Sequence, residues 1–143
     1  NGCKAFVSFE LFEHLHDPSL FLEQLYGLMK SGDLFIFTTP SGAGADIRAL
    51  WEDSKTVAPP HHINLFNPCS IRYLLDSLGF QVLETATPGK LDIDILCNDQ
   101  DKIKDRFWQV FFQQADQKQK KAMQTTLAET GFSSHMMITA YKT

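Results

Sequence analysis

Excess positive charge is absent from this 143-residue sequence, which carries 13 lysines and arginines against 17 acids and a net charge of −4. Proteins that bind nucleic acid usually present a basic face, so the composition gives no support for nucleic-acid binding. No apolar run approaches the roughly 20 residues of a membrane-spanning helix, and we expect no membrane segment. The cysteines, Cys3, Cys69 and Cys97, are odd in number and lack metal-ligand spacing, which favours a reduced, cytoplasmic setting.

An initiating methionine is also missing. The sequence opens with NGCKAFVSFE and enters the pattern of a buried strand within five residues. We therefore interpret it as part of a larger protein. Its length is that of one domain, and a hydrophobic share of 43% is enough for a core.

Apolar runs and helix caps alternate along the chain. We expect strands at residues 5–9, 34–39, 80–87 and 134–142. Asp17-Pro18 and Asn67-Pro68 each combine a capping side chain with a proline at the first helical position, so both pairs should start helices. A short helix is expected around 47–51, and two helices should lie within 99–130. This alternation predicts an α/β layered sheet.

Two stretches carry a family resemblance: FELFEHLHDPSLFLEQLYGLMKSGDLFIFTTPS and PPHHINLFNPCSIRYLLDSLGFQV. They resemble the C-terminal half of class I S-adenosylmethionine-dependent methyltransferases, particularly the group of ubiquinone-pathway O-methyltransferases. There the fourth strand ends in Glu-His, the fifth ends in Thr-Pro, and a histidine precedes a helix that ends in Gly-Phe. The turn Lys30-Ser31-Gly32-Asp33 departs from the family's Lys-Pro-Gly-Gly. The match is specific over residues 5–90 and looser over 91–142.

The resemblance implies half of a Rossmann-like sheet, strands four to seven with the last antiparallel, and flanking helices. Residues 1–90 would form the core of this half-fold, and residues 91–143 a helical insertion plus the closing strand. The implied reaction is methyl transfer from S-adenosylmethionine to a small-molecule metabolite or cell-envelope acceptor, through an acceptor oxygen. Phe9 and Glu10 would contact the cofactor, while the family's glycine-rich turn and acid for the nucleotide belong to strands one and two.

One stretch, FTTPSGAGADI, imitates that glycine-rich turn. The third glycine of the dinucleotide fingerprint would fall at position 47, which is Ile47. We interpret the stretch as a flexible loop in which Asp46 caps a short helix. Residues 41–66 and the helices within 99–130 would shape the acceptor pocket.

Polar side chains follow the first expected strand, where an α/β sheet binds its ligands. Glu10, Glu13 and His14 are spaced i, i+3 and i+4, so one helical turn would place them on one face. Two crowded carboxylates repel each other unless a cation lies between them. The resemblance to the magnesium site of small-RNA 3′-terminal 2′-O-methyltransferases and their ubiquinone-pathway relatives adds His62 as fourth ligand, with His61 in reserve. The implied ion is Mg²⁺ or another divalent cation.

Other interpretations stay open. His14, Glu13 and His62 could act without a metal, with the histidine as a general base oriented by an acid or as a contact to substrate, or they could be structural. His135 is expected to be structural, and Phe107, Val110 and Phe111 to lie in the core or cover a pocket. The chain could also be a non-catalytic binding or assembly module. A metal-dependent hydrolase is disfavoured because no further acid or histidine offers a separate base.

The strand at residues 5–9 should expose an unpaired edge where further strands of the fold would lie. Such an edge invites pairing with another chain. We therefore expect a tendency to form homo-oligomers through it.

Overall fold

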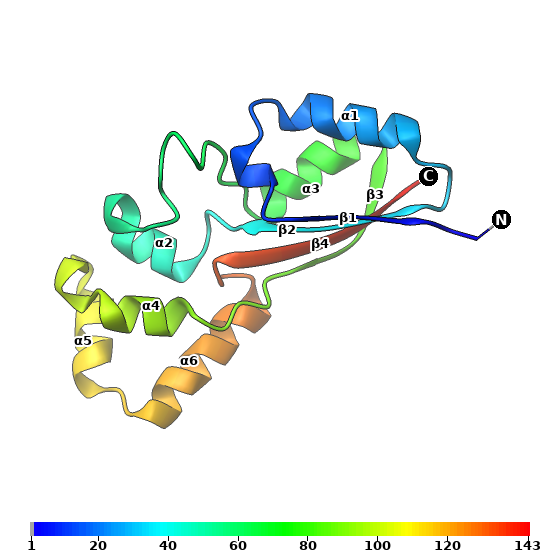
Figure 1. Ribbon diagram of the computed structural model, residues 1–143. Coiled ribbons are helices and arrows are strands. Elements are labelled where there is room, and N and C mark those ends of the chain that lie inside the picture. Colours follow the sequence, from blue (N-terminus) through cyan, green and yellow to red (C-terminus); the bar gives the residue numbers. More distant parts are fainter. Residues whose placement is uncertain (1) are drawn as a thin grey trace.

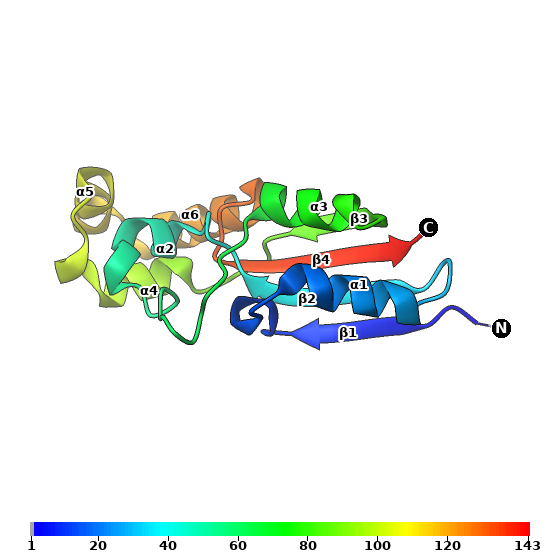
Figure 2. The ribbon, with the colours of Figure 1, turned by 90° about the horizontal axis from the view of Figure 1, so that it is seen from above.

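The computed structural model describes residues 2–143 and shows a four-stranded sheet with helices at one face and at one end (Figures 1 and 2). The strands are β1 (Ala5–Phe9), β2 (Leu34–Pro40), β3 (Phe80–Ala86) and β4 (His135–Lys142). The α-helices are α1 (Pro18–Leu28), α2 (Ala45–Leu50), α3 (Pro68–Ser77), α4 (Asp92–Asn98), α5 (Arg106–Gln114) and α6 (Gln117–Thr130). Single 3₁₀ turns are η1 (Phe12–His14), η2 (Trp51–Asp53) and η3 (Gln100–Lys102).

The sheet has the order β1-β2-β4-β3. β1 pairs with β2 in parallel, whereas β4 is antiparallel to both of its neighbours, β2 and β3. The last strand in sequence is thus inserted antiparallel between two earlier strands. This arrangement confirms the predicted fold class.

The two helices with Pro at their first position cover one face of the sheet. α1 is capped by Asp17, and α3 by Asn67, whose side chain forms a capping box with Ser70. Both helices lie on the same side in Figure 1. Their inward side chains, such as Leu22 and Ile71, pack on strand residues in a core of completely or almost completely buried side chains: Phe35, Phe37, Phe80, Met136, Ile138 and Ala140.

The opposite face of the sheet has no helix over it among residues 2–143 (Figure 1). Val7 and Phe9 project there, with 60% and 66% of their surface exposed. β1 is also an outer strand, and its outer edge has no strand partner within the described chain. The expected unpaired edge is therefore observed, and association through it remains a prediction.

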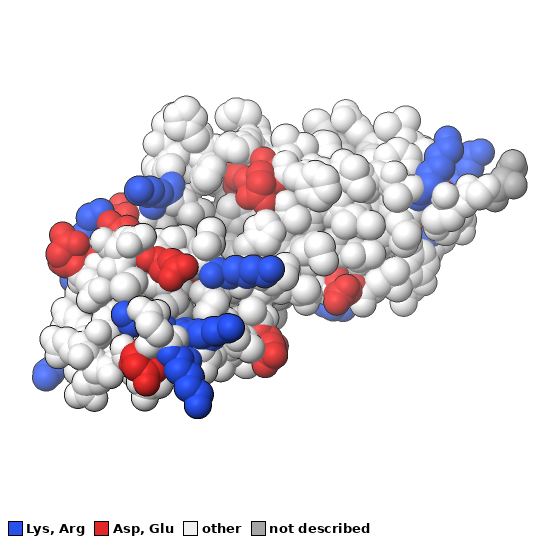
Figure 3. All heavy atoms as spheres, turned by 60° about the horizontal axis from the view of Figure 1, so that its bottom comes forward, with Lys and Arg blue, Asp and Glu red and all other residues white. Residues whose placement is uncertain are grey.

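The end of the molecule beyond the strand tips is helical. Leu50 of α2, Ile93 and Leu96 of α4, and Leu127 of α6 belong to a second buried cluster. Acidic and basic side chains are interspersed over this end, as Figure 3 shows. Within the described residues no helix is both long enough and apolar enough to cross a membrane.

The two helices expected within residues 99–130 are observed as α5 and α6, but residues 99–105 contain only the η3 turn. Helix α4 was not predicted, and one cap was assigned wrongly. The N-cap of α2 is Gly44, not Asp46, which lies buried inside the helix. A Cβ on Gly44 would lie 2.3 Å from the Cα of Ser134, so the glycine permits close packing against the start of β4.

The α5 stripe was expected to lie in the core or to cover a pocket, and the core position does not hold for two of its members. Phe107 and Val110 are 59% and 48% exposed. They line a shallow hollow of about 470 Å³ together with Phe111.

The turn between α1 and β2 contains a carboxylate that organises the backbone. Oδ1 of Asp33 accepts a hydrogen bond from the amide of Lys4 and Oδ2 one from the amide of Lys30, each at 2.9 Å. These bonds, that of Lys30 first, lower the pKa of Asp33. A lowered pKa means that the folded state favours the charged form.

Replacing Asp33 with asparagine should lower the melting temperature at pH 7, because one amide loses its acceptor. Stability from a lowered carboxyl pKa is present above the unfolded value and is lost as the pH falls through the folded value. The deficit of Asp33→Asn should therefore shrink below about pH 4. Thermal unfolding followed by circular dichroism from pH 2 to 7 measures this, with Asp76→Asn on exposed α3 surface as control. A deficit that does not change with pH would contradict the assignment.

Candidate functional site

The site is built at the tip of β1, where the chain leaves the sheet. Glu10 has a φ of +49°, and its amide donates to the carbonyl of Thr38 at 3.1 Å. The turn η1 follows directly. Its first residue, Phe12, is completely buried and stacks on Phe37 with ring centroids 4.3 Å apart. Burial of this ring holds the next two residues, Glu13 and His14, at the strand tips.

Glu13 is a buried acid with a defined partner. Its side chain is 2% exposed, and its Oε2 accepts a hydrogen bond from the hydroxyl of Thr39 at 3.0 Å. Its other oxygen, Oε1, lies 3.9 Å from Nε2 of His14. One carboxylate oxygen is thus held by the tip of β2, and the other faces an imidazole.

The loop after η2 is fastened to η1 through the backbone. The carbonyl of Glu13 accepts a hydrogen bond from the amide of Ile63 at 2.7 Å. The side-chain amide of Asn64 donates to the carbonyls of Phe12, at 3.2 Å, and Leu15. These bonds bring His62, nearly fifty residues away in sequence, beside Glu13.

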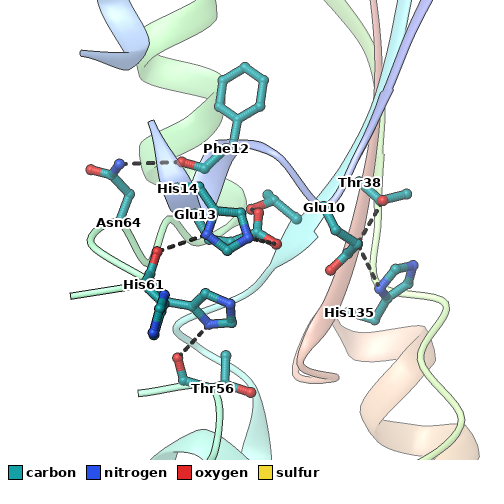
Figure 4. A network of polar contacts seen from close by, with 11 residues as sticks. Glu10, Phe12, Glu13, His14, Thr38, Thr56, His61, Asn64 and His135 are labelled. Atoms are coloured by element: carbon teal, nitrogen blue, oxygen red, sulfur yellow. Dashed lines mark hydrogen bonds and ion pairs between the residues drawn. The ribbon is translucent and has the colours of Figure 1, made fainter. Parts of the chain in front are cut away.

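Both histidines are oriented by backbone carbonyls. Nδ1 of His14 lies 2.8 Å from the carbonyl of His61 (Figure 4). Nδ1 of His62 lies 2.9 Å from the carbonyl of Thr56. A carbonyl only accepts hydrogen bonds, so each Nδ1 must carry the proton. In the neutral imidazole, Nε2 then has a free lone pair. The two rings meet edge-on with centroids 4.9 Å apart.

Glu13, His14 and His62 offer ligand atoms that all lie within 4.8 Å of one another. A carboxylate and two imidazoles whose far nitrogens donate to carbonyls are the donor set expected of a metal site. The three residues present therefore fit a divalent cation. They would hold it from three sides, with Thr39, Thr56 and His61 as the supporting groups.

The expected common face for Glu10, Glu13 and His14 is not observed. Glu10 precedes η1, and its left-handed backbone turns the side chain away from Glu13 (Figure 4). Its Oε1 accepts from the hydroxyl of Thr38 at 2.7 Å and lies 3.7 Å from Nδ1 of His135. Glu10 is therefore removed from the predicted ligand set, and His61 contributes only its carbonyl.

Glu10 and His135 form a separate pair that the sequence did not suggest. β2 and β4 pair in a register that puts His135 opposite Pro40, at the same end of the sheet as Glu10. Both side chains are about half exposed. Phe9 and Glu10 are thus exposed at the carboxyl end of β1. Their contact with the cofactor remains a prediction.

Sequence reasoning also missed the supporting residues. Thr39 could have been suspected, because polar residues end the apolar run LFIFTTP at the ligand side of the sheet. Thr56 and Asn64 carry no such signal. They act from an irregular loop, whose course depends on tertiary contacts.

Comparison with known proteins agrees with this architecture. Residues 3–85 match the family model described as "Methyltransferase domain". A protein of Mycolicibacterium smegmatis described as a probable S-adenosylmethionine-dependent methyltransferase is 28% identical over 80 residues, covering 55% of this chain and 29% of its own.

Among solved structures, a SAM-dependent methyltransferase of Archaeoglobus fulgidus matches 97% of this chain and 59% of its own, with 16% identity and a TM-score of 0.55. Phosphoethanolamine N-methyltransferase 2 of Haemonchus contortus, in complex with S-adenosyl-L-methionine, matches 96% of this chain and 33% of its own, with 16% identity and a TM-score of 0.58. The chain thus spans less than two thirds of each of these relatives. At such identities the structural matches show the fold alone.

Proposed function

We propose that this chain, which belongs to the methyltransferase domain family, takes part in methyl transfer from S-adenosylmethionine to a small-molecule acceptor, and that Glu13, His14 and His62 hold a divalent cation there. The observation that carries the proposal is the convergence of these three side chains at the strand tips. In open α/β sheets this is where ligands bind.

The acceptor atom we propose is an oxygen, as in the ubiquinone-pathway group that the motifs resemble. A bound divalent cation would supply Lewis acidity, lowering the pKa of a hydroxyl so that its oxyanion can attack. Displacement at a methyl sulfonium otherwise needs mainly positioning and exclusion of water. The chain's own contribution is therefore rigid placement of three ligands, through the burial of Phe12 and the bonds to Thr39 and Thr56.

The loss of Glu10 from the ligand set changes the expected ion. One carboxylate and two imidazoles are richer in nitrogen than the oxygen-dominated sites that Mg²⁺ prefers. Imidazole ligands suit transition-metal ions better. We therefore expect Mn²⁺ or a related ion to bind more tightly than Mg²⁺.

A metal-free role for the same residues has its own support in the pair Glu13–His14. The ring of His14 is oriented by the carbonyl of His61, and its Nε2 lies 3.9 Å from the buried carboxylate of Glu13. In this arrangement Nε2 could act as a general base, and the carboxylate would stabilise the imidazolium that forms. This alternative predicts activity that survives removal of metal ions. The cation proposal predicts that activity is lost.

Mn²⁺ titration followed by the loss of free-ion electron paramagnetic resonance signal measures the site directly. Glu13→Gln and His62→Ala should each weaken Mn²⁺ binding at least about tenfold, because each removes a ligand. Glu10→Gln, which changes an acid on the other side of the strand tip, should leave the affinity nearly unchanged. Equal affinities for all four proteins would refute the cation site.

The activity is tested on the full-length protein that contains this chain, with methyl-labelled S-adenosylmethionine and a metabolite extract. We expect label transfer that EDTA abolishes, Mn²⁺ restores and Glu13→Gln removes. Transfer that EDTA leaves intact would favour the general-base alternative. A protein that binds Mn²⁺ but transfers no label would support the binding-module alternative.

A further inference from the structure

A hollow of about 540 Å³ lies between α2, the start of α3, α5 and the C-terminal end of α6. Its volume is within the range of about 300–1,000 Å³ that is usual for small-molecule sites. None of Glu13, His14 and His62 lines it, so the hollow is separate from the candidate cation site. The side chains that determine its chemistry are Arg48, Asn67, Trp108, Leu127 and Phe132.

Arg48 is the charged side chain of this wall, and no acid among the described residues lines the hollow. The residue is exposed and forms no ion pair within 4 Å with any described acid. Its guanidinium lies 5.3 Å from the ring centre of Trp51. Such a cation–π contact engages the face of the guanidinium and leaves the N–H groups at its edge free to donate.

The acids closest to Arg48 in sequence do not cancel this charge at the hollow. Glu52 pairs with Lys104 at 3.1 Å. Asp46 is 2% exposed and lines a different cavity, and desolvation by burial raises its pKa to about 6. A ligand in the hollow therefore meets a positive charge, and electrostatic complementarity favours an anion.

The uncharged polar side chains of the wall offer donors as well. Oδ1 of Asn67 accepts hydrogen bonds from the amides of Cys69 and Ser70, so Nδ2 is the polar group that Asn67 can offer to a ligand. The indole nitrogen of Trp108 can only donate. Donors beside an arginine suit a ligand with oxygen acceptors, and a carboxylate matches the planar fork of a guanidinium.

The rest of the wall is apolar and partly aromatic. Phe132 is 54% exposed and Trp108 is half-buried, so a ligand can reach both rings. Trp108 stacks on Phe112 with ring centroids 6.0 Å apart, and the amide of Ala45 donates to the carbonyl of Phe132 at 2.8 Å. These contacts hold the two sides of the hollow in place. Aromatic rings favour aromatic partners beyond the area that they bury.

We propose that this hollow binds a small aromatic carboxylate, whose oxygens accept hydrogen bonds from the guanidinium of Arg48 and whose ring packs against Trp108 and Phe132. Leu127 supplies further apolar wall for the ring. The site requires no metal ion and does not depend on the proposed methyl transfer.

Titration of 2-naphthoate into the ¹⁵N-labelled protein at pH 7.5, followed by heteronuclear NMR, tests the proposal. EDTA is present throughout, so that the carboxylate cannot bind through a metal ion at the candidate cation site. We expect saturable shifts at the indole N–H of Trp108 and at the amide of Ala45. Affinity should fall at least about tenfold in Arg48→Gln, because the charged donor is lost.

Arg106→Gln is the matched control. Arg106 lines the separate hollow on α5 together with Phe107 and Phe111, and that hollow also combines a cation with aromatic side chains. The affinity of Arg106→Gln for 2-naphthoate should equal that of the parent. A loss of affinity in Arg106→Gln instead of Arg48→Gln would place the ligand on α5 and overturn the proposal.

2-Naphthamide, an uncharged analogue of the same shape, is the second probe and needs no variant. It should bind the parent at least about tenfold more weakly than 2-naphthoate does, and Arg48→Gln should change its affinity far less. Equal binding of the two probes would show an apolar hollow without anion recognition. That result, an absence of saturable shifts, or an unchanged affinity of Arg48→Gln for 2-naphthoate would each refute the site.

Discussion

Replacing Phe12 with alanine is expected to lower the free energy of unfolding by about 3–5 kcal/mol, the range for deleting a buried aromatic ring. Phe12 is completely buried, stacks on Phe37 and meets Phe21 edge-on with centroids 5.6 Å apart. The cost combines lost burial of the ring with the cavity that it leaves. Because Phe12 precedes Glu13 directly, the same change should loosen the candidate site.

Urea unfolding of the parent, Phe12→Ala and Phe107→Ala gives this comparison. Phe107 carries the same ring on α5 but is 59% exposed, so its replacement should cost well under half as much. Phe12→Leu, which keeps most of the volume, should lie between the two alanine variants. If Phe12→Ala were no more destabilising than Phe107→Ala, the turn η1 would not be anchored in the core as described.

Replacing Asp46 with asparagine should change how the free energy of unfolding depends on pH. The difference in this free energy between the parent and Asp46→Asn should change by about 3 kcal/mol between pH 4 and pH 8. The pKa of Asp46 is raised from 3.8 to about 6 in the folded protein, a shift of about two units at 1.36 kcal/mol each. The folded state then binds the proton more tightly than the unfolded state does. Stability of the parent should therefore fall as the pH rises from about 4 to 6, and stay lower above that range.

The measurement is the difference in free energy of unfolding between the parent and Asp46→Asn at each pH. At pH 4 both carry a neutral side chain, whereas at pH 8 only the parent carries a buried charge. The free energy of unfolding of the parent should therefore decrease relative to that of the variant as the pH rises. Asp94→Asn serves as control, since its acid is exposed. A difference that stays constant across this range would mean that Asp46 is not held in the low-polarity surroundings described.

The regular elements could be predicted where local chemistry determines them. Asn67 and Pro68 start α3 through a cap and a fixed backbone angle, and Gly79, at a φ of +89°, follows its end. These effects need only a few neighbouring residues. Helix α4 was missed because LDIDILCN is short and alternates apolar with polar residues, a pattern that fits a strand as well as a helix.

The candidate site was only partly predictable. The grouping of Glu13, His14 and His62 followed from the family resemblance, and the structure brings the three together. Glu10 was misplaced because its spacing was read as one continuous helical turn. A φ of +49° at a glutamate is uncommon and carries no sequence signal, yet it separates Glu10 from the other two.

The supporting contacts lay beyond sequence reasoning altogether. Thr56 and Asn64 hold the site through a backbone carbonyl and a side-chain amide in an irregular loop. The buried Asp46 looked like an ordinary helix cap, because its surroundings come from α4 and β4, far along the chain. Long-range packing of this kind decides which polar groups become functional.

Diffraction from crystals soaked in MnCl₂, measured at the manganese absorption edge, tests the central claim most directly. We predict one strong anomalous peak bounded by the free carboxylate oxygen of Glu13 and the Nε2 atoms of His14 and His62. A peak located instead between Glu10 and His135, or no peak at millimolar Mn²⁺, would contradict it.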